Sequence, residues 1–266
     1  MKNYHKNKII TSNLIIFLFI LILFTSCNGP VFLGSHHTYL DRPMIHDNNK
    51  SVVQTTGKVN YNPNFELEKA VNRSAEIGFH YAKQFKSAYF NIGAFGMAGD
   101  LKVKINAQQL VTKLSYKGGG FRIGGGHTFE LSQYNDVSLG LYSDIFYEKT
   151  NLLKNLTSSS SYIFNDYFNE YLSKNVGFCA EYRQKINKGH WGIAQAIDIS
   201  ERTESIKDVY LHHSVFITKG VYNLVGQLSY SPAFSKTAIF SLTVGLNLNY
   251  KPQNLIGNFN KNYKLF

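Results

Sequence analysis

The stretch that decides the fold is AIFSLTVGLNLNY, residues 238–250 of the 266-residue sequence. Apolar and polar residues alternate along it without a charge or a proline, and this period of two is typical of a β-strand. Large apolar side chains from Phe240 to Tyr250 share one face, while the other face carries only Ser, Thr, Gly and Asn. The stretch therefore predicts a strand with one apolar and one polar, uncharged face.

The same alternation recurs through most of the chain. Short turns such as 187–189 alternate with longer links such as 62–73 and 150–170. This arrangement predicts an all-β fold, an antiparallel up-and-down transmembrane β-barrel of about ten strands, with eight as the alternative count. The predicted strands lie at about 51–61, 74–85, 88–102, 117–131, 135–149, 171–187, 189–200, 206–218, 220–231 and 238–250.

The character of the polar face decides between a soluble and a membrane barrel. Soluble barrels turn their apolar face inward and carry charged residues outside, whereas membrane barrels turn their apolar face to lipid. The polar face of 238–250 has no charge to solvate an exterior, so we expect its apolar face to meet lipid. Phe240 to Tyr250 spans about 33 Å, or about 25 Å once tilted, which matches a membrane band. Charged residues make up only 17% of the chain and aromatic residues 15%.

The N-terminal region predicts export. A lysine-rich start precedes an apolar run at 14–24, which is too short to span a membrane and is typical of a signal peptide. Phe24-Thr25-Ser26-Cys27 resembles a bacterial lipobox, which implies cleavage before Cys27 and its acylation by the lipoprotein-processing machinery. An ordinary secretory signal is the alternative.

These signals divide the chain into a signal peptide at 1–26, a periplasmic linker at 27–50, a barrel at 51–250 and a periplasmic tail at 251–266. The formal net charge is +11, and loss of the three lysines before residue 27 lowers it to +8. Because the remaining charge is not clustered, we expect no nucleic-acid partner.

The last predicted strand also carries a specific resemblance. Thr243, Gly245, Leu248 and Tyr250 fall at positions that resemble the β-signal of bacterial outer-membrane barrels, which implies recognition by the barrel-assembly machinery. The whole chain resembles small lipid-anchored outer-membrane barrels of Gram-negative bacteria. This resemblance implies contact with outer-membrane lipid and an N-terminus anchored on the periplasmic side.

Several charged residues fall on the polar faces and would therefore point into the lumen. Buried charges must be paired or hydrogen-bonded, so we interpret them as a structural polar network, with a proton- or ligand-handling site as the alternative. The predicted network comprises Glu76, His80, Asp144, Glu148, Glu181, Arg183 and Asp198.

His212 and Ser214 form the most enzyme-like pair, because a His on the same strand face can activate a Ser hydroxyl. The pair faintly resembles the His-x-Ser motif of outer-membrane lipid A deacylases, although the Asn-Ala that follows the Ser in that family is missing. Glu204 or Asp208 would supply the acid. A lipid-modifying hydrolase is therefore the alternative to a non-enzymatic barrel lipoprotein with a structural or interaction role, and a pore is a third possibility.

Two segments outside the strands could contact partners. The aromatic-rich link at 150–170 is the candidate surface for an extracellular partner. The linker holds residues that could bind a metal, but we interpret it as solvated and expect neither a metal nor a cofactor. These linker residues are His36, His37, Asp41, His46 and Asp47.

Overall fold

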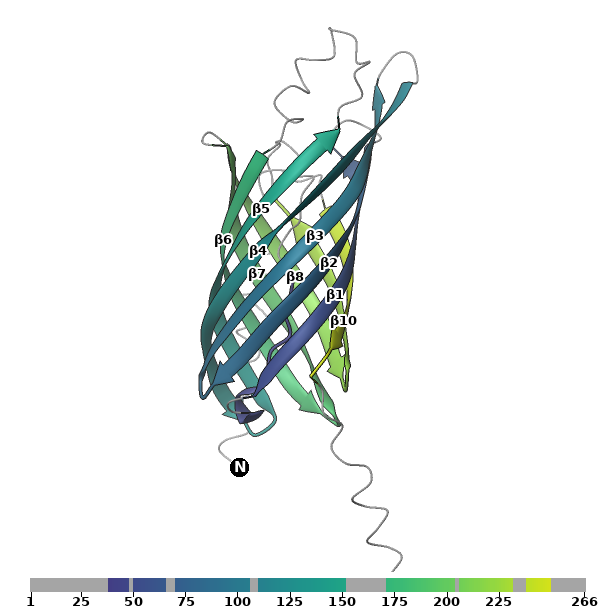
Figure 1. Ribbon diagram of the computed structural model, residues 1–266. Coiled ribbons are helices and arrows are strands. Elements are labelled where there is room, and N and C mark those ends of the chain that lie inside the picture. The colour runs from purple at the N-terminus through teal and green to yellow at the C-terminus, as the bar shows by residue number, and fades with distance from the viewer. Residues whose placement is uncertain are drawn as a thin grey trace, which may run out of the picture.

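Ten antiparallel strands close into a single barrel in the computed structural model, which describes residues 38–47, 50–65, 70–105, 110–151, 171–203, 206–231 and 238–249 (Figure 1). Each strand pairs with its neighbours in the sequence, and β10 pairs with β1 to close the ring. The predicted ten-stranded up-and-down barrel is confirmed. The strands are β1 (Ser51–Phe65), β2 (Ala70–Phe85), β3 (Ala88–Ile105), β4 (Leu110–Ser132), β5 (Asn135–Asn151), β6 (Tyr171–Ile186), β7 (Gly189–Thr203), β8 (Ile206–Lys219), β9 (Tyr222–Tyr230) and β10 (Ala238–Asn247).

The predicted strands are too short at the end opposite the tight turns. The β1–β2 ladder continues to the pair Phe65 and Ala70, so most of 62–73, expected to be a long link, is paired strand. Likewise β4 begins at Leu110 rather than near 117. Backbone pairing continues past the apolar band, whereas sequence alternation fades where one face no longer meets apolar surroundings. Sequence alternation therefore marks the apolar part of each strand and not its full length.

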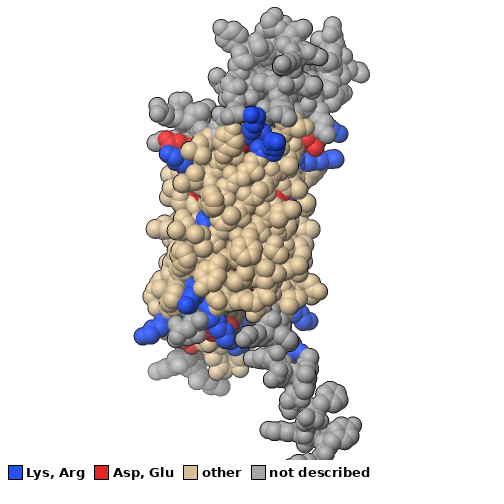
Figure 2. Space-filling model, in the orientation of Figure 1, with Lys and Arg blue, Asp and Glu red and all other residues tan. Residues whose placement is uncertain are grey.

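Apolar side chains cover the outside of the barrel, and polar side chains fill the inside. Ile77 is 73% exposed and Phe121 is 71% exposed, whereas their sequence neighbours Glu76 and Arg122 are buried. Figure 2 shows Lys, Arg, Asp and Glu gathered near the two ends of the barrel, with a largely uncharged band between them. The apolar-out, polar-in arrangement is thus the one the sequence predicted.

Tight two-residue turns join the strands at the end where β1 begins, and the remaining strand ends lie at the opposite end of the barrel (Figure 1). Lys86 and Lys188 adopt positive φ angles of 51° and 62° in two of these turns, as tight hairpins require. Among the described residues, no helix is long and apolar enough to cross a membrane.

Candidate functional site: a polar lumen filled by an N-terminal plug

The segment before β1 enters the barrel and lines its polar interior. We call Thr38–Asp47 the plug; it ends in the short 3-10 helix η1 (Ile45–Asp47) at the tight-turn end of the barrel (Figure 1). Thr38 to Met44 are all buried. The expectation of a solvated linker is therefore wrong for this part of the chain, because its charged and aromatic side chains have partners on the barrel wall.

Arg183 joins the plug to the wall. Its Nε and Nη2 each lie 2.9 Å from an oxygen of Asp136, which is a two-pronged ion pair between β6 and β5. Its Nη1 donates to the backbone carbonyls of Arg42, at 2.8 Å, and Pro43, at 3.0 Å. Glu181 lies 3.1 Å from Arg183 Nε. Since Arg183 is 0% exposed, one guanidinium orders two strands and the plug backbone together.

Arg42 is the plug's own cation and reaches across the lumen. Its guanidinium donates to Thr128 Oγ1 at 3.0 Å and to Ser138 Oγ, and it lies 3.5 Å from Glu181. Its Cζ also sits 4.2 Å from the ring centroid of Tyr89, a cation–π contact. The Arg42 side chain thus contacts several strands at once and donates to polar groups that line the lumen.

Asp41 and Tyr39 fix the plug to β7, β8 and β10. Asp41 Oδ1 lies 2.9 Å from His190 Nε2, and Asn247 donates to Asp41 Oδ2 at 3.3 Å. Burial alone raises the pKa of the Asp41 carboxyl, but His190 and weaker neighbouring groups outweigh burial and leave this pKa below its ordinary value. Tyr39 stacks on Phe216 with ring centroids 4.0 Å apart. Both acidic and aromatic side chains of the plug are therefore fitted to the wall.

A second cluster of buried charges centres on Arg122, which points from β4 into the lumen. Arg122 Nε donates to Asp144 at 2.9 Å, and Nη1 lies 3.6 Å from Glu76. His80 Nε2 lies 3.0 Å from Thr56 Oγ1. A side chain at Gly93 would collide with the His80 ring, so this glycine makes room for the imidazole. Buried charges are compensated here as well, which is the arrangement expected of a structural network.

The third cluster is a continuous chain of hydrogen bonds that links β5, β7, β8 and β9. Tyr142 donates to Asp198 at 3.1 Å, and His212 Nε2 lies 3.0 Å from the same carboxylate oxygen. His212 Nδ1 lies 2.8 Å from Ser229 Oγ, to which Gln227 donates at 2.8 Å. These contacts resemble an acid–His–Ser arrangement in connectivity. However, Ser229 is 0% exposed, so no substrate reaches its hydroxyl in this conformation.

The predicted catalytic pair is arranged differently from expectation. His212 and Ser214 do point to the same side and are both buried, but the hydroxyl within 2.8 Å of the His212 ring belongs to Ser229. The acid beside His212 is Asp198, not Glu204, which lies outside the described residues, or Asp208, which pairs with Ser200 in the β7–β8 register. His212 therefore belongs to the polar network of the lumen.

The structure places every predicted network residue inside the barrel. Glu181 and Arg183 lie together at the plug, Glu76 and Asp144 at Arg122, and Asp198 at His212. Glu148 is buried as well, and His80 lies beside Thr56. Sequence reasoning missed Arg42, Lys58, Arg122, Asp136 and His190, of which all but Arg42 lie on polar strand faces that could have revealed them.

Other predicted residues fall outside this network. In β10, Thr243 is buried and Gly245 packs against Gln54, while Leu248 lies just beyond the strand and is exposed. Tyr250, Cys27, His36, His37 and most of 150–170 lie outside the described residues. Cys179 is a free thiol near the Tyr89 hydroxyl. His46 contacts the carbonyl of Ser132, and no group of His, Cys, Asp or Glu among the described residues is arranged to hold a metal ion.

The architecture is a closed antiparallel β-barrel with an apolar exterior and a polar interior. No family model matches the sequence, and no curated protein matches it. Among solved structures, the β domain of the Bordetella autotransporter BrkA is similar at 10% identity and a TM-score of 0.46, over 74% of this chain and 98% of that one. Neisserial surface protein A is similar at 10% identity and a TM-score of 0.32, over 74% and 97%. Similarity at this level concerns the barrel fold alone and does not establish a location or a role.

Proposed function

We propose that this chain is an outer-membrane β-barrel lipoprotein that spans the membrane as a closed barrel and acts through its extracellular links. The observation that carries the proposal is the inversion of polarity across the wall, apolar outside and charged inside. A soluble protein with this exterior would expose apolar side chains on every strand, which favours aggregation. Lipid is the solvent in which such a surface is stable.

The dimensions of the barrel support the same proposal. The 9 residues of β9 span about 26 Å along the strand, or about 20 Å at a tilt of about 40°, which is most of the height of the usual apolar band. Exposed aromatic residues lie at both ends of this part of the wall, with Tyr222 at one end and Tyr61 and Phe240 at the other. Aromatic rings at these levels are typical of membrane interfaces.

The filled lumen supports a structural or interaction role over a pore. Ten strands enclose a narrow interior, and here the plug and paired charges occupy it. A cavity beside the plug, lined by Tyr39, Arg42 and Tyr142 among others, has a volume of about 30 Å³, which is room for a water molecule. The 150–170 link, with its aromatic residues, remains our candidate for the partner-binding surface.

Fractionation of cells that express the full chain and its Cys27→Ser variant tests the proposal. We expect both proteins in the outer membrane, with a shift in gel mobility between unboiled and boiled samples, because the barrel holds the membrane without the lipid anchor. Metabolic labelling with a fatty acid should mark the wild type only. Release of Cys27→Ser into the soluble fraction would show an anchored soluble domain instead. In planar bilayers we expect no steady conductance.

A further inference from the structure

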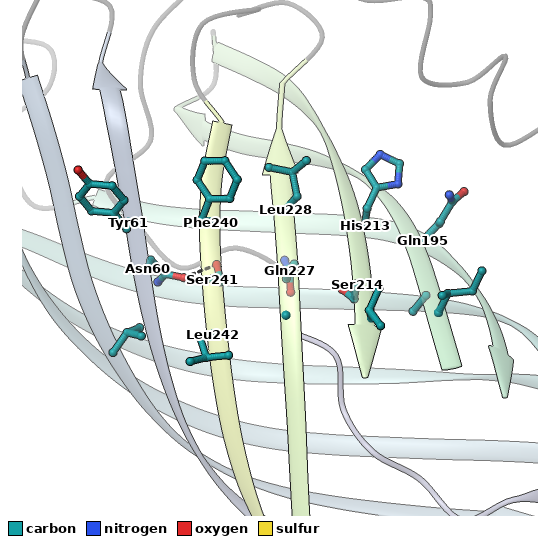
Figure 3. Close-up of a pocket in the computed structure, with 15 residues that line it drawn as sticks. Asn60, Tyr61, Gln195, His213, Ser214, Gln227, Leu228, Phe240, Ser241 and Leu242 are labelled. Atoms are coloured by element: carbon teal, nitrogen blue, oxygen red, sulfur yellow. Dashed lines mark hydrogen bonds between the residues drawn. The ribbon is translucent and has the colours of Figure 1, made fainter. Parts of the chain in front are cut away.

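The outer face of the barrel carries a groove across β1, β10, β9, β8 and β7. Its cavity volume is about 710 Å³. Outward-facing residues in two rows across the strands line it, and Figure 3 shows Tyr61, Phe240, Leu228, His213 and Gln195 in one of these rows. The other row contains Val59, Leu242, Gly226, Val215 and Ile193. The groove is therefore mainly apolar and lies on the surface that we assign to lipid.

Gly226 creates the hollow. It stands in β9 opposite Leu242 on one side and Val215 on the other, and both of these residues project large apolar side chains outward. A Cβ added to Gly226 would meet no atom within 4 Å. No close approach of backbone or side chain therefore requires glycine here, and its effect is to leave space between apolar neighbours.

The groove runs obliquely through the membrane-facing surface. It crosses four interstrand steps, or about 19 Å. Because the strands of such barrels tilt by about 40°, a row across them also climbs along the barrel axis. At the β1 side the groove reaches Tyr61, near the end of β1, whereas at the β7 side Ile193 lies far from the end at Thr203. The groove thus rises by about 12 Å along the barrel axis and reaches the barrel rim, which is most of the thickness of one leaflet, about 15 Å.

A cation lies at the rim end of the groove. Arg73 of β2 is the register partner of Tyr61, and its Cζ lies 5.7 Å from the Tyr61 ring centroid. Arg73 also pairs in register with Asp100 on β3, and its guanidinium lies over the aromatic ring that borders the groove. A guanidinium presents a planar fork of donors that matches phosphate oxygens. The groove therefore combines an apolar channel with an anion-binding group at its rim end.

We propose that this groove binds a membrane lipid with a phosphate headgroup, its acyl chain over Gly226 and its phosphate at Arg73. The histidine of the lining does not oppose this assignment, since His213 Nε2 lies 3.2 Å from the Tyr230 hydroxyl and the two rings stack 5.5 Å apart. The inference rests on the proposed membrane insertion. A lipid of this kind would be held at one place on the wall rather than exchanging as part of the general lipid shell.

Matched variants separate this site from ordinary lipid contact. Gly226→Leu fills the channel, and Gly57→Leu is its control, because Gly57 is also exposed with no atom within 4 Å of an added Cβ but does not line the groove. Arg73→Gln removes the rim cation, and Lys174→Gln removes an exposed cation on β6. Each variant must first fractionate with the outer membrane and show the gel shift on boiling, and failure there would count against the proposed function instead.

Native mass spectrometry of the purified full chain in neutral detergent then measures lipid retention. The probes are phosphatidylglycerol and a neutral diacylglycerol with the same acyl chains. We expect one phosphatidylglycerol retained in preference to the neutral lipid, and about a tenfold weaker retention in Gly226→Leu and in Arg73→Gln, as loss of several methylene contacts or of one charge-assisted hydrogen bond implies. The two controls should retain wild-type binding.

Three results would overturn the proposal. Equal loss in Gly57→Leu would mean that any added bulk on the outer wall displaces lipid. Equal retention of the neutral diacylglycerol would remove the role of the phosphate. A dimer that disappears only in Gly226→Leu would identify a second copy of the chain as the occupant.

Discussion

Replacing Arg183 by Met should destabilise the barrel strongly, because one buried guanidinium joins the wall to the plug. Two of its nitrogens lie 2.9 Å from Asp136 oxygens and a third donates to two plug carbonyls. Removing one partner of a buried ion pair costs about 3–5 kcal/mol, and a buried carbonyl left without a donor costs about 1–3 kcal/mol. These losses share one side chain and do not add fully. We expect about 4 kcal/mol, or nearly a thousandfold in the folding equilibrium.

Urea unfolding in phospholipid vesicles measures this loss, with the fluorescence of Trp191, the single tryptophan, as the reporter. The double variant Arg183→Met with Asp136→Leu is the control, because it removes the charge that the single variant leaves unpaired. It should recover more than half of the lost stability. A loss below about 1 kcal/mol in the single variant, or no recovery in the double variant, would refute the role assigned to this ion pair.

Three further predictions concern the interior. Replacing the plug, residues 38–47, by a Gly/Ser segment of equal length should produce resolvable conductance steps in planar bilayers, where the wild type shows none; a silent variant would mean that the wall side chains alone close the lumen. Asp198→Asn should lower the free energy of unfolding in urea by about 1–3 kcal/mol, because His212 loses a charged acceptor. The same variant should leave the mass spectrum of lipid A unchanged, whereas altered lipid A would support the hydrolase. Gly93→Val should destabilise the barrel by about 1–3 kcal/mol through collision with His80, while Gly226→Val should not, and equal urea midpoints would contradict the close packing at Gly93.

Period-two alternation predicted most of the fold, because a wall with unlike solvents on its two faces leaves that period in every strand. The run at 238–250 is the clearest example, and over β10, residues 238–247, its outward and inward residues are those the structure shows. The outer ends of β1, β2 and β4 escaped prediction, since paired backbone needs no contrast in side-chain polarity. The strand boundaries were therefore best where the chain meets the apolar band.

The interior could be predicted one strand at a time but not as a set of pairs. Alternation places Asp198 and His212 inside, yet only the β7–β8 and β8–β9 registers bring Asp198 and Ser229 to the two ring nitrogens of His212. Ser214 is closer to His212 in sequence than Ser229 is, and sequence spacing therefore predicted Ser214 as the partner of His212. In a β-barrel, hydrogen-bond partners lie on neighbouring strands, so spacing along one strand is a poor guide to a site.

The sequence did not predict the plug, because residues 38–47 have neither a strand nor a helix period. The charges of the barrel wall explain why this segment lies inside. Without the plug, Glu181 and Asp136 would share the single cation Arg183 in place of Arg42 and Arg183 together, and His190 would lose the carboxylate of Asp41. Asp41 and Arg42 of the plug therefore each complete a pair that the wall leaves incomplete, whereas Asp47 pairs with Lys50 just before β1. Because unpaired buried charges are costly, the segment before β1 is as much a part of the folded core as the strands that surround it.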